Sequence, residues 1–234
     1  MIMISHLNIK NNHYFIEKNR GYLTMKLIIF DLDGTLLDTL TDITNSINYT
    51  LNYFNRPAKT EQQVKYYLGQ GPKYLLEKAF DNDLDYKSVY PIYDHHYTKH
   101  QNDYTKPYDG VLETLNALKE KGYLLAVCSN KQDPITKELI KTIFPNTFDY
   151  VIGTSAKLTR KPAPDMVLHI LKALNIKKSE ALYIGDTETD MKTAFNAGLK
   201  VVAVTYGFRS KKELKVYQPD YLVDHPLEIL KKVA

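Results

Sequence analysis

The chain has 234 residues, 44% of them hydrophobic and 25% charged, and its formal net charge is +4, which is the composition of an ordinary globular protein with a sizeable core. Its lysines are scattered along the chain, many of them in pairs, which argues against a nucleic-acid-binding groove. No apolar stretch reaches the roughly 18 residues that a membrane span needs. Cys128 is the single cysteine, which excludes an intrachain disulfide and favours a reducing, cytoplasmic location.

Residues 1–24 come before the first regular element and have no clear hydrophobic period. They also lack the basic start, apolar centre and small-residue cleavage site of a signal peptide. Because Met25 directly precedes the first apolar run, we expect residues 1–24 to be an N-terminal extension that is disordered or not native. The alternative is an extra strand or helix that packs on the core through Tyr14, Phe15 and Ile16.

The first strand is expected over residues 26–31, where the apolar run 27–30 is typical of a parallel strand buried on both faces. Two carboxylates, Asp31 and Asp33, stand at its carboxyl end, which is where ligands of open α/β sheets bind. At that edge Asp31 can attack an electrophile while Asp33 handles protons beside it. A strand followed by an ordinary Asp/Gly turn through Gly34 is the alternative.

Residues 40–104 carry apolar residues at helical spacing and no strand signal, so we expect an all-helical insert there. Its helices are expected at 41–54, 62–68, 73–80 and 86–101. The turn at 69–73 contains Gly71 and Lys73, which are the candidates in this insert for contact with a substrate. A solvated residue that opens a helix is the alternative for Lys73.

Strands and helices alternate from residue 105 onwards, which predicts a doubly wound parallel sheet. Strands are expected at 123–128, 149–152, 181–185, 200–204 and 221–223, and helices at 109–121, 134–142, 164–174, 188–197 and 226–233. The expected architecture is therefore α/β. Its parallel-sheet core comprises residues 25–39 and 105–234, and its inserted α-helical cap comprises residues 40–104.

Further polar groups follow the later strands at the same edge of the sheet. Ser129 and Asn130 come directly after a predicted strand, where a hydroxyl and an amide suit phosphate oxygens. Lys161 lies beside prolines before a helix, in a loop that those prolines stiffen. Asp186 and Asp190 follow another strand and can serve one hard cation such as Mg²⁺. Capping of the next helix by these acids is the alternative.

Four motifs in chain order resemble those of the haloacid dehalogenase-like (HAD) superfamily of phosphohydrolases. They are DLDGT at 31–35, CSN at 128–130, KPAP at 161–164 and GDTETD at 185–190. The resemblance covers roughly residues 25–234 and implies a Rossmann-like core with a helical cap. Less specific stretches are similar to the phosphoglycolate phosphatase group; they are LLDTLTDI, LGQGPKYLLEKAF, SNK, TYGF and QPDYLVD.

The resemblance implies an Mg²⁺-dependent phosphomonoesterase that acts on a small anionic phosphorylated metabolite, with 2-phosphoglycolate as the best candidate. It implies a cytoplasmic monomer or homodimer without nucleic-acid or membrane partners. In such an enzyme Asp31 forms an aspartyl-phosphate and Asp33 is the general acid and base. The implied phosphate ligands are Ser129, Asn130 and Lys161; the implied metal ligands are Asp31, the backbone carbonyl of Asp33, and Asp186; the supporting residues are Thr35 and Asp190.

Other functions remain open at this point. A pyrophosphatase, a nucleotidase or a phosphosugar mutase would use the same fold and the same motifs. A haloacid dehalogenase would need neither Asp33 nor the acidic pair Asp186 and Asp190, so these residues argue against it. A non-catalytic regulatory protein on the same fold is the alternative from another class, and the presence of all the proposed catalytic groups argues against that one.

Overall fold

The computed structural model describes residues 25–233. The expected N-terminal extension, with the alternative element at Tyr14–Ile16, therefore lies outside the described residues. None of the helices in residues 25–233 has both the length and the apolar character that crossing a bilayer requires.

The core is built on a six-stranded sheet in which every pairing is parallel. The strand order is β5-β4-β1-β6-β7-β8, with β1 in the interior of the sheet. The strands are β1 (Leu27–Phe30), β4 (Leu124–Gln132), β5 (Tyr150–Thr154), β6 (Ala181–Gly185), β7 (Lys200–Val204) and β8 (Tyr221–Val223). The predicted α/β fold with a doubly wound parallel sheet is confirmed.

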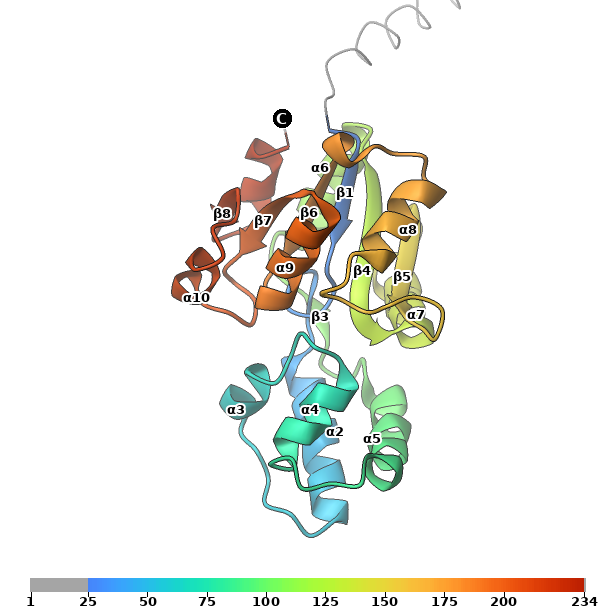
Figure 1. The fold of residues 1–234 in the computed structure, drawn as a ribbon, viewed down its shortest axis with the longest axis vertical. Helices are drawn as coiled ribbons and strands as arrows, with labels where there is room; N and C mark the ends of the chain where they lie inside the picture. The colour runs from blue at the N-terminus through green and yellow to red at the C-terminus, as the bar shows by residue number, and fades with distance from the viewer. Residues whose placement is uncertain (1–24, 234) are drawn as a thin grey trace, which may run out of the picture.

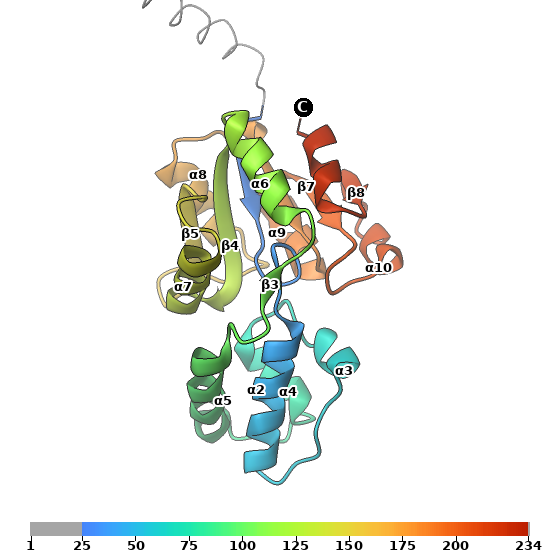
Figure 2. The same ribbon diagram turned by 180° about the vertical axis from the view of Figure 1, so that it is seen from behind.

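Helices cover both faces of this sheet. One face carries α6 (Val111–Glu120), α7 (Asp133–Ile143) and the 3₁₀ helix η2 (Pro226–Lys231), and the other carries α8 (Asp165–Ala173), α9 (Glu188–Ala197) and α10 (Lys211–Lys215). Figure 1 shows α8 and α9 in front of the sheet, and Figure 2 shows α6 from behind. A further 3₁₀ helix, η1 (Lys178–Glu180), leads into β6.

The apolar side chains of β1 pack on both faces of the sheet, because successive side chains of a strand point to opposite faces. Ile28 and Phe30 belong to the core beneath α6, and Leu27 and Ile29 belong to the core beneath α8. All four are buried, so no position of this strand has to be polar.

Four helices lie beyond the carboxyl edge of the sheet, in the lower part of Figure 1. They are α2 (Leu40–Tyr53), α3 (Glu61–Lys65), α4 (Pro72–Ala79) and α5 (Tyr86–His100). Two short antiparallel strands, β2 (Leu37–Asp38) and β3 (Lys106–Pro107), form the two connections to the core. We keep the division into a core of residues 25–39 and 105–234 and a cap of residues 40–104 as a proposal.

The buried carboxylate of Asp42 fastens the second connection to the first cap helix. It accepts hydrogen bonds from the backbone N–H groups of Tyr104 and Thr105, and a further one of 2.7 Å from the hydroxyl of Thr105. The polypeptide therefore leaves and re-enters the core at one fixed point.

The structure differs from the sequence expectation at several places in the core. Strand β4 does not end at residue 128 but runs to Gln132, with an irregular register against β5 between Cys128 and Gln132. Ser129 and Asn130 are thus part of the irregular end of a strand, where such a bulge re-aims side chains. The strands β2 and β3 and the helix α10 were not predicted, because two to five residues are too short for a periodic pattern.

Candidate active site

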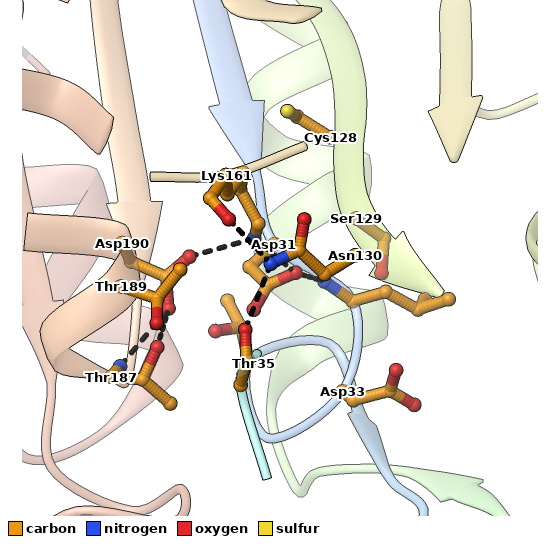
Figure 3. Close-up of polar contacts among 12 residues, drawn as sticks. Asp31, Asp33, Thr35, Cys128, Ser129, Asn130, Lys161, Thr187, Thr189 and Asp190 are labelled. Atoms are coloured by element: carbon orange, nitrogen blue, oxygen red, sulfur yellow. Dashed lines mark hydrogen bonds and ion pairs between the residues drawn. The ribbon is translucent and has the colours of Figure 1, made fainter. Parts of the chain in front are cut away.

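The candidate site lies at the carboxyl edge of the sheet, where β1, β4 and β6 end side by side (Figure 3). The end of β1 supplies Asp31 and Asp33, and the loop after β6 supplies Asp186. Lys161 reaches in from the loop before α8, and Asp190 comes from the first turn of α9.

The centre of the site is a buried ion cluster. The ammonium group of Lys161 lies 2.8 Å from Asp31 Oδ1 and 2.8 Å from Asp190 Oδ1, and it donates a hydrogen bond of 3.1 Å to the hydroxyl of Tyr183. Figure 3 shows Lys161 between the two carboxylates. Burial opposes the charge of Lys161, but the two carboxylates outweigh burial and raise its pKa.

Both oxygens of Asp190 are fully engaged. Oδ1 accepts from Lys161 and from Tyr183, and Oδ2 accepts from the backbone N–H of Thr187 at 3.0 Å and from its hydroxyl at 2.6 Å. Burial disfavours the charged form, yet the Lys161 ammonium and the Thr187 donors lower the pKa of Asp190. Asp190 is therefore an ionised carboxylate that holds Lys161 in place.

Asp186 is held from two sides. Thr35 donates its hydroxyl to Oδ1 at 2.8 Å, and the backbone N–H of Phe208 donates to Oδ2 at 2.7 Å. The loop after β1 passes so close that a Cβ on Gly34 would lie 2.3 Å from Asp186 Oδ2, and Gly34 has φ +85°. A side chain at position 34 would displace the carboxylate, so this turn requires glycine.

The carboxylates carry more negative charge than the cluster neutralises. Oxygens of Asp31, Asp186 and Asp190 lie within 4.8 Å of one another, and all three residues are buried. Burial, and after it the charge of Asp190, raises the pKa of Asp31 well above its ordinary value. The same two causes raise the pKa of Asp186 to about 7. An excess of buried carboxylate oxygens around one ammonium group fits a divalent cation bound at this point.

Asp31 has one oxygen that is fixed and one that is not. Oδ1 accepts the backbone N–H of Leu32 at 2.7 Å and faces Lys161. Both of these contacts within residues 25–233 fall on Oδ1. Asp31 therefore has one carboxylate oxygen free to act on a ligand.

Ser129 and Asn130 lie at the end of β4 beside Asp31. Both are buried, and the Ser129 hydroxyl accepts the backbone N–H of Lys131 at 3.1 Å. The side-chain amide of Asn130 donates to the carbonyl of Lys161 and to the carbonyl of Gly69, each at 3.0 Å. Asn130 thus ties the lysine loop and a cap turn to the same strand end.

The side chain of Asp33 points away from the ion cluster (Figure 3). The ammonium of Lys131 lies 2.8 Å from Asp33 Oδ1 and donates to the hydroxyl of Tyr97 at 2.6 Å. The contact between Lys131 and Asp33 is an ion pair whose geometry is not that of a hydrogen bond. The sequence assigned no role to either partner: Lys131 is the last residue of the SNK stretch, and Tyr97 is one of 19 tyrosines.

A cavity opens above these groups, between core and cap. Asp31, Asp33, Ser129, Asn130 and Lys131 form its core side. The cap side is mostly apolar and aromatic; it includes Ile43, Tyr67, Leu68, Leu75, Tyr93 and Tyr97. The cap side therefore offers an apolar wall opposite the carboxylates.

The two cap residues that the sequence singled out lie differently. Gly71 lines the cavity, with φ +82° at the start of α4. Lys73 is outside the lining; its side chain is 58% exposed and its ammonium lies 3.9 Å from Glu77. In this structure the cation at the cavity is Lys131 and not Lys73.

Arg209 provides a further tie between core and cap that the sequence did not reveal. Its buried guanidinium donates to the carbonyls of Lys65 and Leu68, each at 3.0 Å, and pairs with Glu188 at 2.8 Å. It therefore holds the end of α3 and the turn that follows this helix against the core.

Comparison with known proteins gives a consistent family. A model of the haloacid dehalogenase-like hydrolase family matches residues 28–204. A phosphoglycolate phosphatase of Aquifex aeolicus is 33% identical over 208 residues, which cover 88% of this chain and 96% of the relative. A phosphoglycolate phosphatase of Mesorhizobium japonicum is 30% identical over 210 residues, which cover 87% of this chain and 92% of the relative.

The fold is also similar to solved structures. A crystal structure described as a predicted phosphoglycolate phosphatase from Haemophilus somnus superposes with a TM-score of 0.86. It shares 30% sequence identity, and the match covers 92% of this chain and 100% of that one.

Proposed function

Because the chain belongs to the haloacid dehalogenase-like hydrolase family, we propose that it is an Mg²⁺-dependent phosphatase for a small phosphorylated metabolite, with 2-phosphoglycolate as its substrate. The observation that supports this most is the buried Asp31, which lines the cavity and has its carboxylate oxygen Oδ1 held by Lys161 and by the backbone N–H of Leu32. The names of the relatives support the choice of substrate.

Asp31 is the proposed nucleophile. Its Oδ2 attacks phosphorus, the bond between phosphorus and the ester oxygen breaks, and an aspartyl-phosphate forms. Ser129, Asn130 and Lys161 surround the position of Asp31 and are the proposed ligands of the phosphate oxygens. Lys161 carries its charge there because Asp190 holds it.

Asp33 is the proposed acid and base. It lines the same cavity as Asp31, and its carboxylate is directed away from the ion cluster. We assign that side of the cavity to the leaving group. Asp33 gives a proton to the leaving oxygen, and then takes a proton from the water that attacks the aspartyl-phosphate. This second step releases phosphate and returns Asp31 to its free form.

The residues present fit a divalent cation, and Mg²⁺ is the proposed one because it prefers one or two carboxylates together with phosphate and water oxygens. Asp31, Asp186 and the backbone carbonyl of Asp33 would hold it, while Asp190 is engaged with Lys161 and Thr187. When bound, the cation reduces repulsion between carboxylates and phosphate and stabilises the charge that develops on the transferred group.

A phosphate-release assay tests the proposal. The substrates are 2-phosphoglycolate, ethyl phosphate, a nucleoside monophosphate and pyrophosphate, each with Mg²⁺ and with EDTA. We expect Mg²⁺-dependent release with the highest kcat/KM for 2-phosphoglycolate. A higher kcat/KM for pyrophosphate or for the nucleotide would refute the substrate, and activity that persists in EDTA would refute the metal.

A further inference from the structure

We propose that Lys131 determines the substrate class: it binds a carboxylate that the substrate carries two atoms from the leaving oxygen. This inference rests on the proposed function and assigns recognition to a residue outside the four motifs. It replaces Lys73, which the turn at the start of α4 had suggested from the sequence.

The position of Lys131 follows from that of Asp33. To protonate the leaving oxygen, Asp33 must approach it to about 2.6–3.2 Å. The Lys131 ammonium lies 2.8 Å from Asp33 Oδ1 and lines the same cavity. In 2-phosphoglycolate two C–O or C–C bonds, each of about 1.5 Å, separate the leaving oxygen from the carboxylate carbon. The Lys131 ammonium, which lies beside Asp33, can therefore reach the carboxylate of the substrate.

The environment of Lys131 makes this charge effective. Its side chain is 6% exposed and lies 4.8 Å from the ring centroid of Tyr97, whose hydroxyl it also contacts. The cap wall beside it is apolar, with Leu75 and Tyr93 among its residues. An ion pair in such a partly desolvated place is stronger than the same pair in water.

The other cations near the site are bound to other groups or lie outside the cavity lining. Among the described residues that line the cavity, Lys131 is the one cationic side chain. The Lys161 ammonium is enclosed by Asp31 and Asp190 at the phosphate end. Arg209 is bound to Glu188 and to cap carbonyls. Arg160 comes near the turn at Gly71 but is exposed and outside the lining.

A substrate carboxylate can join Lys131 beside its present partners. An ammonium group has three donors. In the part of the chain that the structure describes, one donor goes to Tyr97 and Asp33 lies 2.8 Å from the ammonium nitrogen, which leaves a donor for a carboxylate of the substrate.

The test compares two substrates of equal backbone length, 2-phosphoglycolate with the carboxylate and ethyl phosphate without it. The variants are Lys131→Met, Lys131→Gln, which keeps a polar N–H group without the charge, and Lys131→Arg, which keeps the charge. Lys137→Met is the matched control, since Lys137 is 56% exposed on α7 and pairs with Asp133. Arg160→Met tests the competing cation.

We expect Lys131→Met and Lys131→Gln to lower the ratio of kcat/KM for 2-phosphoglycolate to that for ethyl phosphate by about 10- to 100-fold, the range of a lost charge-assisted hydrogen bond. Lys131→Arg should restore most of the ratio, and Lys137→Met and Arg160→Met should leave it unchanged. If Lys131→Met melts at a lower temperature than the wild type, the ratio measured for Lys131→Gln tests the inference in its place.

Three results would overturn the inference. An equal loss for both substrates in the Lys131 variants would mean that Lys131 acts only by positioning Asp33. Loss of the ratio in Arg160→Met alone would move recognition to that cation. A wild-type protein that hydrolyses both substrates equally well has no carboxylate site. Phosphate release from neither substrate by the wild type would instead refute the proposed phosphatase itself.

Discussion

Mg²⁺ should stabilise this protein more at pH 8 than at pH 5, because burial and Asp190 raise the pKa of Asp186 to about 7. A carboxyl group whose folded-state pKa is raised holds its proton more tightly in the folded state than in the unfolded one. The free energy of unfolding therefore falls as the pH rises from the unfolded pKa of about 3.9 to the folded pKa. Below both pKa values this loss of free energy of unfolding is absent, and above both values it has its full size.

The size of the effect follows from the shift. Each unit of pKa corresponds to about 1.4 kcal/mol, so ionisation of Asp186 lowers the free energy of unfolding by about 4 kcal/mol above pH 7 and by about 1–2 kcal/mol at pH 5. For a chain of this size, 1 kcal/mol changes the melting temperature by about 2–4 °C. In EDTA the melting temperature should thus fall by about 5–10 °C between pH 5 and pH 8 on account of Asp186. A divalent cation favours the ionised carboxylates and should cancel this fall.

The assay is thermal unfolding in EDTA and in excess Mg²⁺ at pH 5, 6, 7 and 8. The difference between the two melting temperatures should grow across this range. Asp186→Asn should remove most of both the difference and its pH dependence, whereas Asp109→Asn, which removes a fully exposed carboxylate, should preserve them. A stabilisation by Mg²⁺ that is the same at pH 5 and pH 8 would show that the reasoning about Asp186 is wrong.

Three further predictions concern turnover. Asp31→Asn should abolish phosphate release while the circular dichroism melt still shows a folded chain, because an amide is a poor nucleophile; retained turnover would exclude Asp31 from that role. Asp33→Asn should slow hydrolysis of ethyl phosphate by about 10²–10⁴-fold and that of an aryl phosphate with a good leaving group much less, and equal losses would contradict proton donation. The double variant Arg209→Met/Glu188→Gln removes the hydrogen bonds from Arg209 to the carbonyls of Lys65 and Leu68 without leaving Glu188 charged. Because these bonds hold the cap against the core, the variant should raise KM for 2-phosphoglycolate several-fold and speed backbone hydrogen exchange at residues 65–68. Wild-type values for both quantities would show that Arg209 does not hold the cap.

The parts of the site that the sequence predicted are those that the sheet determines. Asp31 and Asp186 each follow a continuous apolar run, and such runs end together at one edge of a parallel sheet. The strand β6 was predicted at its observed residues for the same reason. The positions of these two acids in the fold could therefore be inferred from the sequence pattern, although their roles could not. The same holds for Lys161, whose loop leads into α8.

The contacts across the cap could not be predicted, because they depend on how two units meet. Lys73 follows Gly-Pro at the start of a helix, and Lys131 follows Ser-Asn at the end of a strand. Neither local pattern tells whether the side chain is exposed, yet one is 58% exposed and the other 6%. Arg209 reaches Leu68, which is 141 positions away in the sequence. The hydrophobic periodicity of each segment does not indicate that these two residues are in contact.

Three consecutive side chains of β4 link the phosphate end of the site to the cap. Asn130 donates to the cap carbonyl of Gly69, Lys131 to Tyr97, and Gln132 to Tyr90 at 2.6 Å. Because Ser129 and Asn130 are also the proposed phosphate ligands, a phosphate that fixes this strand end should fix these cap contacts too. The cap in turn supplies the apolar wall beside Lys131, which is the proposed carboxylate site. Binding of the phosphate and selection of the leaving group are therefore expected to be coupled through one short segment, and changes of the cap can alter the substrate without altering the chemistry at Asp31.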